Sequence, residues 1–564
     1  MSVLDWTVLL GTLFLIVVYG LWKSRGSKNI SQYLKGDNSL KWGTIGLSVM
    51  ATQASAITFL STPGQAYESG MAFVQNYFGL PIAIIIVAAI FVPIYYKLNV
   101  YTAYEFLEQR FDLKTRLLGA FLFLIQRGLA AGITIYAPAI ILSTMLHWDL
   151  TYTILFTGIL VVLYTVSGGT KAVSITQKYQ MAVIMLGMFR AFFIIISYLP
   201  ENVSFINALH VAGKMDKLDV VDFSFDPEKR YTIWTGLTGG FFLALSYFGA
   251  DQSQVQRYVG AKSVAESRLG LIFNALFKVP MQFFILLVGV MVFVFYQFEE
   301  PPVFFKSVEM EQLRASEYRA DIQALEDQYS ANFEEKKTNI VNLVDALNEN
   351  DEQQIATYTD QVKQHKASEQ KIRQEVKGLL KEYDESIETK DSDYVFLTFI
   401  TNYLPEGVVG LLLAVIFSAA MSSSSGELNA LGSTASIDFY KRVFKKEASD
   451  KHYLIASKLL TAFWGILAVG FALFASLVEN LIEAVNILGS IFYGVILGMF
   501  LIAFFIKYIK GNAVFYAAII SQITVIFLFK TLSISYLWYN VIGCVLVVVL
   551  SHLIHSTLNF NKSK

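Results

Sequence analysis

The chain has 564 residues, of which 55% are hydrophobic, 15% aromatic and only 16% charged, and its mean hydropathy is +0.50. Soluble domains usually carry about 25% charged residues, so this composition predicts a polytopic membrane protein. The formal net charge of −1 gives no sign of a nucleic-acid partner. The single cysteine, Cys544, excludes a disulfide framework and a cysteine-based metal site.

Membrane-spanning helices need about 20 mostly apolar residues, and this rule yields about 13 candidates. The first of them lacks a basic n-region and a small-residue cleavage site, so we expect a retained span and not a signal peptide. The predicted spans are 4–23, 42–69, 71–96, 116–146, 151–167, 173–199, 231–250, 269–297, 404–437, 453–478, 481–506, 512–530 and 534–555.

Lysine and arginine in short loops predict the orientation of the chain, because such loops favour the cytoplasmic side. Basic residues gather in the segments 23–41, 97–116, 251–268 and 440–451. All four segments fall on one side if the N-terminus is outside and the C-terminus is cytoplasmic. We therefore expect a multi-pass protein of the cell (inner) membrane with this orientation.

One long segment, 298–393, interrupts the apolar pattern and contains about half of the 45 acidic residues. Its apolar residues recur at helical spacing, and "NENDE" at 348–352 has the composition of a turn. We expect a hairpin of two or three helices outside the membrane. It is either a solvated insertion or a docking module for an accessory protein.

Two spans contain helix-breaking or polar residues, which in transporters marks the binding site. The second span is polar around Gln53 and Thr58, and Pro63-Gly64 is expected to break its outer end. The seventh span contains four glycines: Gly236, Gly239, Gly240 and Gly249. Five spans separate their starts, which fits two five-helix units of opposite topology. Ordinary packing of small residues is the alternative explanation.

The ninth predicted span ends in "FSAAMSSSSGELNALGSTASIDFY", 417–440, where hydroxyl groups and Glu427 follow an apolar run. Polar groups buried in hydrocarbon cost free energy unless they find partners. Ala419, Ser422, Ser423 and Gly426 fall on one helix face. Their hydroxyls, with freed carbonyls of a broken helix, would form a neutral oxygen cluster for a monovalent cation such as Na⁺. Serine can also bond back to its own helix, so the cluster alone is weak support.

Five stretches in the same order resemble the sodium/solute symporter family, and most closely its iodide, multivitamin and monocarboxylate branch. The resemblance covers most of residues 1–510 apart from the insertion. It implies ten core helices in a leucine-transporter-like 5+5 inverted repeat, and sodium-coupled symport. The stretches are "LSVMATQASAITFLSTPGQAY" (47–67), "GITIYAPAI" (132–140), "YTVSGGTKAV" (164–173), "QVQRYVGAKS" (254–263) and "SAAMSSSSGELNALGSTASIDFYK" (418–441).

The resemblance implies a division of the chain into five parts. They are 1–40, an extra N-terminal helix with an inner loop; 41–297, the first repeat and the start of the second; 298–393, the charged insertion; 394–510, the rest of the second repeat; and 511–564, two C-terminal helices with a cytoplasmic tail.

The family's principal sodium site is built from carbonyls of the first broken helix and of the serine helix, together with two hydroxyls. Matched to this chain, its ligands are Ala51, Ala54, Ala419, Ser422 and Ser423.

Some members bind a second sodium through an aspartate in "TDxxQ" and two further hydroxyls. This chain has Gln177 in place of that aspartate and Gly426 in place of one hydroxyl. We therefore expect one sodium ion per cycle and no other cofactor.

The expected solute is a small organic or inorganic anion, because the positions of polar sugar contacts are occupied by Thr58, Tyr77 and Leu80. Charged residues within spans are functional candidates, although snorkelling or structural pairing explains many of them. Arg127, Lys278 or Arg190 could pair with a carboxylate, and Asp251 could contact solute, take a proton or pair with Arg257. The other pocket candidates are Gln53, Thr58, Gln75, Tyr77 and Tyr247.

Three other functions were considered. A sodium-coupled sugar or polyol symporter is the nearest alternative. A non-transporting membrane sensor is the second, although the end of the chain, "HSTLNFNKSK", leaves no room for a signalling domain. A membrane enzyme finds no support, because the sequence has no P-loop, zinc-ligand set or paired carboxylates within the spans.

Overall fold

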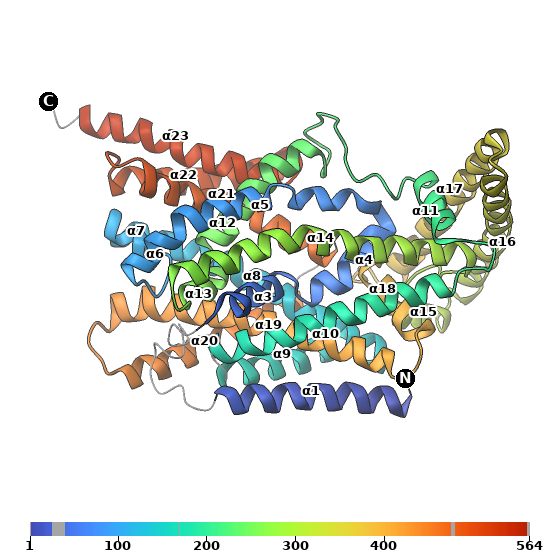
Figure 1. Cartoon of the computed structure of the whole chain (residues 1–564), viewed down its shortest axis with the longest axis horizontal. Helices are drawn as coiled ribbons and strands as arrows, with labels where there is room; N and C mark the ends of the chain where they lie inside the picture. The colour runs from blue at the N-terminus through green and yellow to red at the C-terminus, as the bar shows by residue number, and fades with distance from the viewer. Residues whose placement is uncertain (1, 25–39, 168–169, 475–479, 561–564) are drawn as a thin grey trace.

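The computed structural model describes residues 2–24, 40–167, 170–474 and 480–560, and their regular structure is helical (Figure 1). In these ranges the only pairing of extended backbone is one bridge between Leu40 and Ala261. All thirteen predicted spans coincide with helical segments. Nine candidates within the described residues are long and apolar enough to cross a membrane.

The spans are formed by α1 (Val3–Ser24), α3 (Trp42–Gln53) with α4 (Ala56–Ser69), η2 (Gly70–Tyr77) with α5 (Leu80–Ile86), η3 (Val87–Phe91) and α6 (Val92–Leu98), α8 (Leu113–Leu146), α9 (Leu150–Ser167), α10 (Thr170–Ser197), η4 (Thr235–Gly240) with α12 (Phe241–Ala250), α14 (Val264–Phe298), α19 (Val408–Thr434), α20 (Asp450–Phe474), α21 (Leu481–Phe505), α22 (Gly511–Thr531) and α23 (Trp538–Phe560). The remaining elements are α7 (Glu105–Arg110), α11 (Phe205–Lys214), α13 (Gln252–Val259), α15 (Ser307–Arg314), α16 (Arg319–Glu349), α17 (Glu352–Tyr383), α18 (Ser392–Tyr403) and η5 (Ala435–Phe444).

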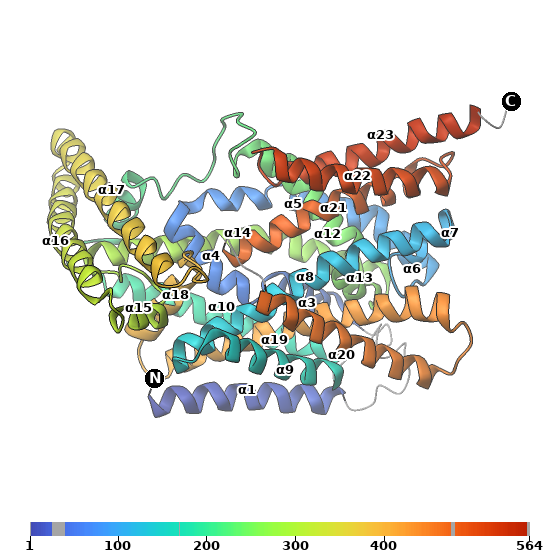
Figure 2. The ribbon, with the colours of Figure 1, turned by 180° about the vertical axis from the view of Figure 1, so that it is seen from behind.

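The long helices run side by side in one bundle, with α1 on one flank and α22 and α23 on the opposite flank (Figures 1 and 2). Helix α19 packs against α1, α8, α10 and α20, and it is the most deeply buried of the nine candidate spans. The interior of the bundle is therefore built around the helix that carries the serine run.

The predicted insertion forms α15, α16 and α17 at one end of the bundle, opposite the C-terminus (Figures 1 and 2). Helices α16 and α17 form an antiparallel hairpin, and its turn lies at the predicted position. Asn350 has a φ of 55°, and the carboxylate of Asp351 caps α17 by accepting from the backbone amides of Gln353 and Gln354. The insertion has its own apolar cluster, which includes Ile322, Tyr329, Val376 and Leu380. We call the end of the bundle that carries it the insertion end.

The second span is broken at Ala54 and Ser55, next to the carbonyls that the family resemblance implied, and not at Pro63-Gly64. Helix α3 ends at Gln53 and α4 begins at Ala56, while α4 continues through Pro63 to Ser69. The expected break at Pro63-Gly64 is therefore wrong. Gly64 serves close packing instead, because a Cβ there would lie 1.8 Å from the carbonyl oxygen of Ser392.

The break at Ala54 and Ser55 leaves carbonyls of α3 without helical partners. One of them, on Gln53, accepts from the hydroxyl of Thr58 at 3.2 Å. Ser55 has an extended backbone, with φ −74° and ψ 179°, and it separates the two half-helices.

Three of the four glycines in the seventh span lie in η4, a π-helical segment that continues directly into α12, and the backbone becomes extended only at Asp251, after the end of the predicted span. The glycines allow two backbones to approach closely. A Cβ on Gly236 would lie 2.1 Å from the carbonyl oxygen of Gln75, and one on Gly240 would lie 2.5 Å from that of Asn76. The alternative explanation by small-residue packing therefore accounts for these glycines.

Candidate functional site

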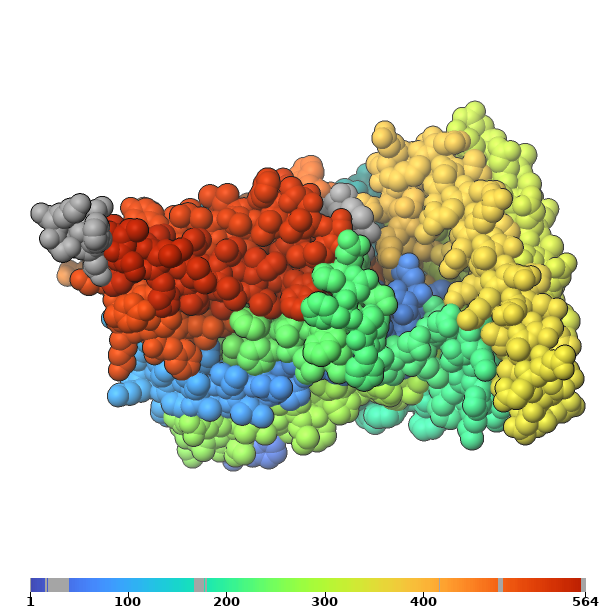
Figure 3. All heavy atoms as spheres, turned by 90° about the horizontal axis from the view of Figure 1, so that it is seen from above, coloured from blue at the N-terminus to red at the C-terminus, as the bar shows by residue number. Residues whose placement is uncertain are grey.

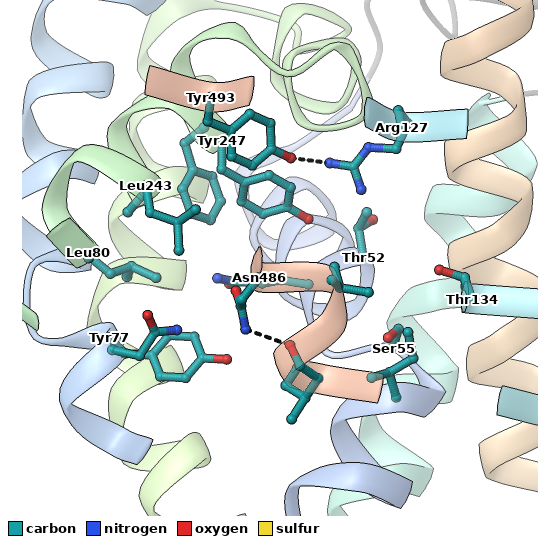
Figure 4. Close-up of a pocket in the computed structure, with 18 of the residues that line it drawn as sticks. Thr52, Ser55, Tyr77, Leu80, Arg127, Thr134, Leu243, Tyr247, Asn486 and Tyr493 are labelled. Carbon is teal, nitrogen blue, oxygen red and sulfur yellow. Dashed lines mark hydrogen bonds between the residues drawn. The ribbon is translucent and has the colours of Figure 1, made fainter. Parts of the chain in front are cut away.

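A cavity of about 100 Å³ lies in the middle of the bundle, beside the break between α3 and α4 (Figure 4). One water molecule occupies roughly 10–15 Å³ of such a cavity volume, so the cavity has room for a small solute. Besides the residues labelled in Figure 4, the lining includes Gln53, Ile57, Asn76, Phe248, Glu427 and Ile482. Its walls combine aromatic and aliphatic groups with a few polar ones, which is typical of small-molecule sites.

The N-terminal end of α4 opens onto this cavity through Ser55 and Ile57. The side chain of Ser55 makes no capping hydrogen bond, so the first amides of α4 have no acceptor from that side chain. A helix N-terminus carries partial positive charge and favours anions. This end of the cavity is therefore suited to a negatively charged group.

Arg127 of α8 is bonded to two carboxylates and a phenol at the edge of the cavity. Its guanidinium donates to Glu427 at 2.9 Å and also to Asp251 and Tyr493, and the Tyr493 hydroxyl donates to Asp251 at 2.6 Å. The Tyr247 ring lies 5.5 Å from the guanidinium carbon. Figure 4 shows the Tyr493 hydroxyl directed at Arg127.

The cluster of Arg127, Asp251, Glu427 and Tyr493 is buried, with Arg127 only 2% exposed. One guanidinium faces two carboxylates, so the ionised cluster has an excess of one negative charge. Arg127 and Asp251, which were predicted as separate solute contacts, are instead bonded to each other. The guanidinium is already neutralised and is a poor counter-ion for a solute carboxylate.

The serine run lies on α19, which packs against both α3 and α4. Ala51, Ala54, Ala419, Ser422 and Ser423 are all buried. The Ser423 hydroxyl donates to the carbonyls of Ala419 and Ala420, at 2.9 and 3.1 Å. The Ser422 hydroxyl is 2% exposed and has no hydrogen-bond partner among the described residues. It is a buried oxygen without a partner, on a helix that packs against the broken one, and an ion ligand has these properties.

Gln177 of α10 ties that helix to α3. Its amide oxygen accepts from the Ser48 hydroxyl at 2.6 Å, and its amide nitrogen donates to the Thr52 hydroxyl at 3.2 Å. Gly426 on α19 lies against Arg257, because a Cβ there would be 2.1 Å from a guanidinium nitrogen. At both positions where the sequence departs from the family pattern, the expected sodium ligand is therefore replaced. The hydrogen-bonded amide of Gln177 lies at one position, and the guanidinium of Arg257 lies against Gly426 at the other.

The remaining predicted residues divide into three groups. Gln53, Tyr77 and Tyr247 line the cavity, whereas Thr58 and Gln75 do not. Gln75 bonds to the carbonyls of Ala72 and Tyr231 and to the amide of Asp222.

The two remaining cations lie outside the lining. The ammonium of Lys278 is 5.1 Å from the Tyr77 ring and donates to Gln282 at 3.2 Å, so it lies close to the cavity but behind the tyrosine. Arg190 is exposed and does not join the site.

Sequence reasoning did not single out Asn76, Thr134, Asn486 or Tyr493, which also line the cavity. It noted Glu427 only as a charge out of place in an apolar helix. That charge was the one available signal, since an ionisable residue within a span marks a functional or paired site. Tyr493 and Asn486 lie in an ordinary apolar span, and nothing in their spacing distinguishes them.

The fold and the central cavity define a membrane transport protein. The model of the sodium:solute symporter family matches residues 33–308 and 386–528, so the chain belongs to that family. Family membership also agrees with the expectation that the protein is not an enzyme.

Three curated relatives illustrate the similarity. The chain is 34% identical to sodium-coupled monocarboxylate transporter 1 of Xenopus laevis over 274 residues, 48% of this chain and 44% of that protein. It is 33% identical to the sodium/iodide cotransporter of Homo sapiens, over 49% of this chain and 43% of the relative. The match to sodium-coupled monocarboxylate transporter 1 of Mus musculus is longer, at 28% identity over 88% of this chain and 68% of the relative. The first two matches thus span less than half the length of those relatives.

Among solved structures, a substrate-bound, outward-open sodium-coupled sialic acid symporter matches with a TM-score of 0.75. The sequence identity is 22%, and the match covers 99% of this chain and 98% of that one. This similarity confirms the predicted leucine-transporter-like inverted-repeat fold.

Proposed function

We propose that the protein is a sodium-coupled symporter that imports a small anionic solute by alternating access. The observation that carries this proposal is the cavity at the broken helix, onto which the uncapped N-terminus of α4 opens, together with the packing of the serine-bearing helix α19 against both halves of that broken helix. A half-helix N-terminus for the solute anion, beside unwound carbonyls for the cation, is the arrangement that sodium-coupled transporters use.

The sodium ligands in this proposal are the carbonyls of Ala51, Ala54 and Ala419 and the hydroxyls of Ser422 and Ser423. Five neutral oxygens can replace the hydration shell of Na⁺ without holding it too tightly to leave. One ion per cycle is supported by the hydrogen bonds that occupy Gln177 and by the guanidinium against Gly426.

The solute in this proposal places its negative group at the start of α4 and its body between Tyr77, Tyr247 and Leu243. Lys278 supplies further positive potential from behind Tyr77. Two amide oxygens of the lining, on Gln53 and Asn76, are buried without a hydrogen-bond partner among the described residues. They would accept from a hydroxyl or amine of the solute, so a small hydroxy-acid or amino-acid anion satisfies the site best.

The unpaired amide oxygens of Gln53 and Asn76 also favour a second candidate, a neutral sugar or polyol, which offers donors without charge. The two candidates differ at the N-terminus of α4. A neutral solute would leave the positive helix end without an anion, whereas a carboxylate would satisfy it.

For the direction of transport, we infer that the insertion end faces outward and the C-terminus inward, as the basic loops indicate. Entry of one Na⁺ at a membrane potential of 100 mV then releases about 2.3 kcal/mol. A docking role of the insertion for an accessory protein stays a prediction.

The test is thermal stability of the purified protein in NaCl against KCl, over a panel of small carboxylates, halides, sugars and polyols. A ligand that binds only the native state stabilises it by mass action. We expect sodium to stabilise the protein by itself, and one class of anion to add to this only when sodium is present. Stabilisation by a sugar would change the proposed solute from an anion to a sugar. Equal stabilities in sodium and potassium would contradict the ion site.

A further inference from the structure

A second cavity, of about 470 Å³, lies at the insertion end between the α16–α17 hairpin and the bundle. Figure 3, which views the molecule from above, shows a hollow near the insertion, where blue atoms from early in the chain lie between green and yellow segments. Six cationic residues line the cavity against only three acidic ones. The cations are Lys217, Lys336, Lys366, Lys371, Arg373 and Lys377, and the acids are Glu68, Glu369 and Asp391.

All three acidic residues are already in ion pairs. Glu369 accepts from Lys336 at 2.5 Å, Asp391 from Arg373 at 2.7 Å, and Glu68 pairs with Lys390 at 2.9 Å. Lys390 is not part of the lining.

Four lysines of the lining, Lys217, Lys366, Lys371 and Lys377, have no carboxylate within 4.0 Å in the described part of the chain. Two of them, Lys366 and Lys377, are half-buried on the same helix, α17. The cavity is therefore a partly desolvated space with an excess of positive charge.

Lys217 connects this cavity to the transport core. It is 4% exposed, and its ammonium donates to the carbonyls of Tyr67 and Glu68, at 2.7 and 2.6 Å. Those carbonyls lie at the end of α4, the half-helix whose other end opens onto the central cavity. A charge held in the second cavity therefore lies against the far end of the helix proposed to bind the solute.

Burial disfavours the charged form of these lysines in the absence of an anion. Burial, together with the nearby charge of Lys366, lowers the pKa of Lys217 to about 7. Burial also lowers the pKa of Lys366 and of Lys377. A bound anion would relieve this penalty, because an opposite charge favours the charged form of each lysine.

We propose that the cavity between the insertion and the end of α4 is a binding site for a multiply charged oxyanion, separate from the central cavity. The anion lies between Lys366 of the insertion and Lys217 and so links the hairpin to α4, while Lys377, about 16 Å further along α17, adds positive charge to the same cavity. The ligand chemistry is that of a phosphate, sulfate or polycarboxylate group, carried either by a free anion or by a phospholipid headgroup.

A purely structural basic patch does not explain this arrangement as well. Solvated lysines on a helix surface keep their ammonium groups in water, whereas Lys217 and Lys336 are almost completely buried. Burying a charge is costly unless it is paired, and Lys336 has its pair in Glu369 while Lys217 bonds only to neutral carbonyls.

The experiment measures the thermal stability of the full-length protein in neutral detergent, with sodium sulfate or sodium phosphate against sodium chloride at equal sodium concentration, and with choline chloride added to equalise the ionic strength. The test variant is Lys366→Gln with Lys377→Gln. The control is Lys381→Gln, which removes one positive charge from an exposed position of α17 outside the cavity.

Sulfate and phosphate are expected to stabilise the wild type and the control beyond chloride. The double variant should require a concentration higher by about tenfold or more, because it loses the charge-assisted hydrogen bond of Lys366 and the positive charge that Lys377 adds to the cavity. Absence of an oxyanion effect in the wild type, or an equal effect in the double variant, would overturn the site. Sodium against potassium is compared in the same samples, so a failure of the ion site of α19 is recognised separately.

The source of the anion is resolved in nanodiscs. If phosphatidylglycerol in a phosphatidylcholine disc abolishes the sulfate effect, a headgroup occupies the site. If sulfate acts equally in both discs, the ligand is a free anion. Either result supports an oxyanion site.

Sulfate, which stays divalent, also gives a pH readout. Lys217 faces Lys366 and Glu369 of α17, Glu68 of α4 and Asp216 of its own loop. Since its pKa lies near 7 without the anion and rises with it, sulfate should bind more tightly at about pH 6 than at about pH 8. The opposite pH trend would contradict a role for Lys217.

Discussion

Ser422 and Ser423 are neighbours on α19 with different hydrogen bonding, and the difference bears on how a cation would be held. The Ser423 hydroxyl donates its proton to its own helix, which leaves its lone pairs available to a cation. The Ser422 hydroxyl makes no bond to any described residue. Both oxygens can therefore accept a sodium ion without breaking a hydrogen bond of the helix.

Replacement of Ser423 by alanine tests whether its hydroxyl is a sodium ligand. The loss of one neutral oxygen ligand should raise the sodium concentration for half-maximal stabilisation or uptake by about tenfold, which corresponds to about 1.4 kcal/mol. Ser433→Ala is the matched control, because Ser433 is also buried on α19 and donates to a carbonyl of its own helix, at 2.9 Å. An unchanged sodium dependence in Ser423→Ala, or an equal change in both variants, would contradict the assignment.

Residue identities in contiguous motifs could be predicted from the sequence, but pairings across the bundle could not. The serine face follows from helical spacing within eight residues. Arg127 and Asp251 are 124 residues apart, and the sequence left open whether each contacts the solute or forms a structural pair. Only the packing of α8 beside the α12–α13 junction shows that they neutralise each other.

At the scale of elements, the cluster around Arg127 joins four separate parts of the chain. Arg127 lies on α8, Asp251 between α12 and α13, Glu427 on α19 and Tyr493 on α21. A buried charge cluster of this kind is sensitive to the removal of one member, because the partners remain buried without compensation. The cluster therefore holds the middle of the bundle together next to the solute cavity.

Arg127→Gln should destabilise the protein by about 3–5 kcal/mol, since two buried carboxylates lose their cation. Adding Asp251→Asn and Glu427→Gln should restore part of that stability, because the unpaired charges are then removed as well. Thermal unfolding of the single and triple variants measures this. If Arg127→Gln is as stable as the wild type, or the triple variant is less stable than the single one, the cluster does not act as described.

The positions of the spans were predictable from the sequence, whereas the exact site of a helix break was not. Apolar runs and basic loops indicated every span that the structure describes. Pro63 suggested a break that is absent, because one missing amide does not interrupt a helix that is packed on both sides by α14 and α18. The real break, at Ala54 and Ser55, has no proline or glycine to announce it.

At the scale of the whole molecule, the family match stops at residue 308 and resumes at residue 386, so it leaves out almost exactly the insertion hairpin. The family model thus describes the core of the chain and does not include the insertion. The core carries both proposed ion and solute sites, and the insertion carries the lysines of the proposed oxyanion site.

The function could be predicted as far as the class of protein, because the motifs of the second span and of the serine helix are specific to the family. The solute could not be predicted, since the cavity lining comes from six spans whose side chains are ordinary in their own contexts. Asn76, Asn486 and Tyr493 become recognisable only where the helices converge on one cavity.

The measurement that tests the central claim most directly is uptake into proteoliposomes that contain the purified protein. An inward sodium gradient is compared with an equal potassium gradient, for the anion that stabilises the protein together with sodium. We predict accumulation above the equilibrium level with sodium only, driven further by a negative internal potential and strongly reduced in Ser423→Ala. Equal uptake under both gradients, or no accumulation above equilibrium, would contradict sodium-coupled symport.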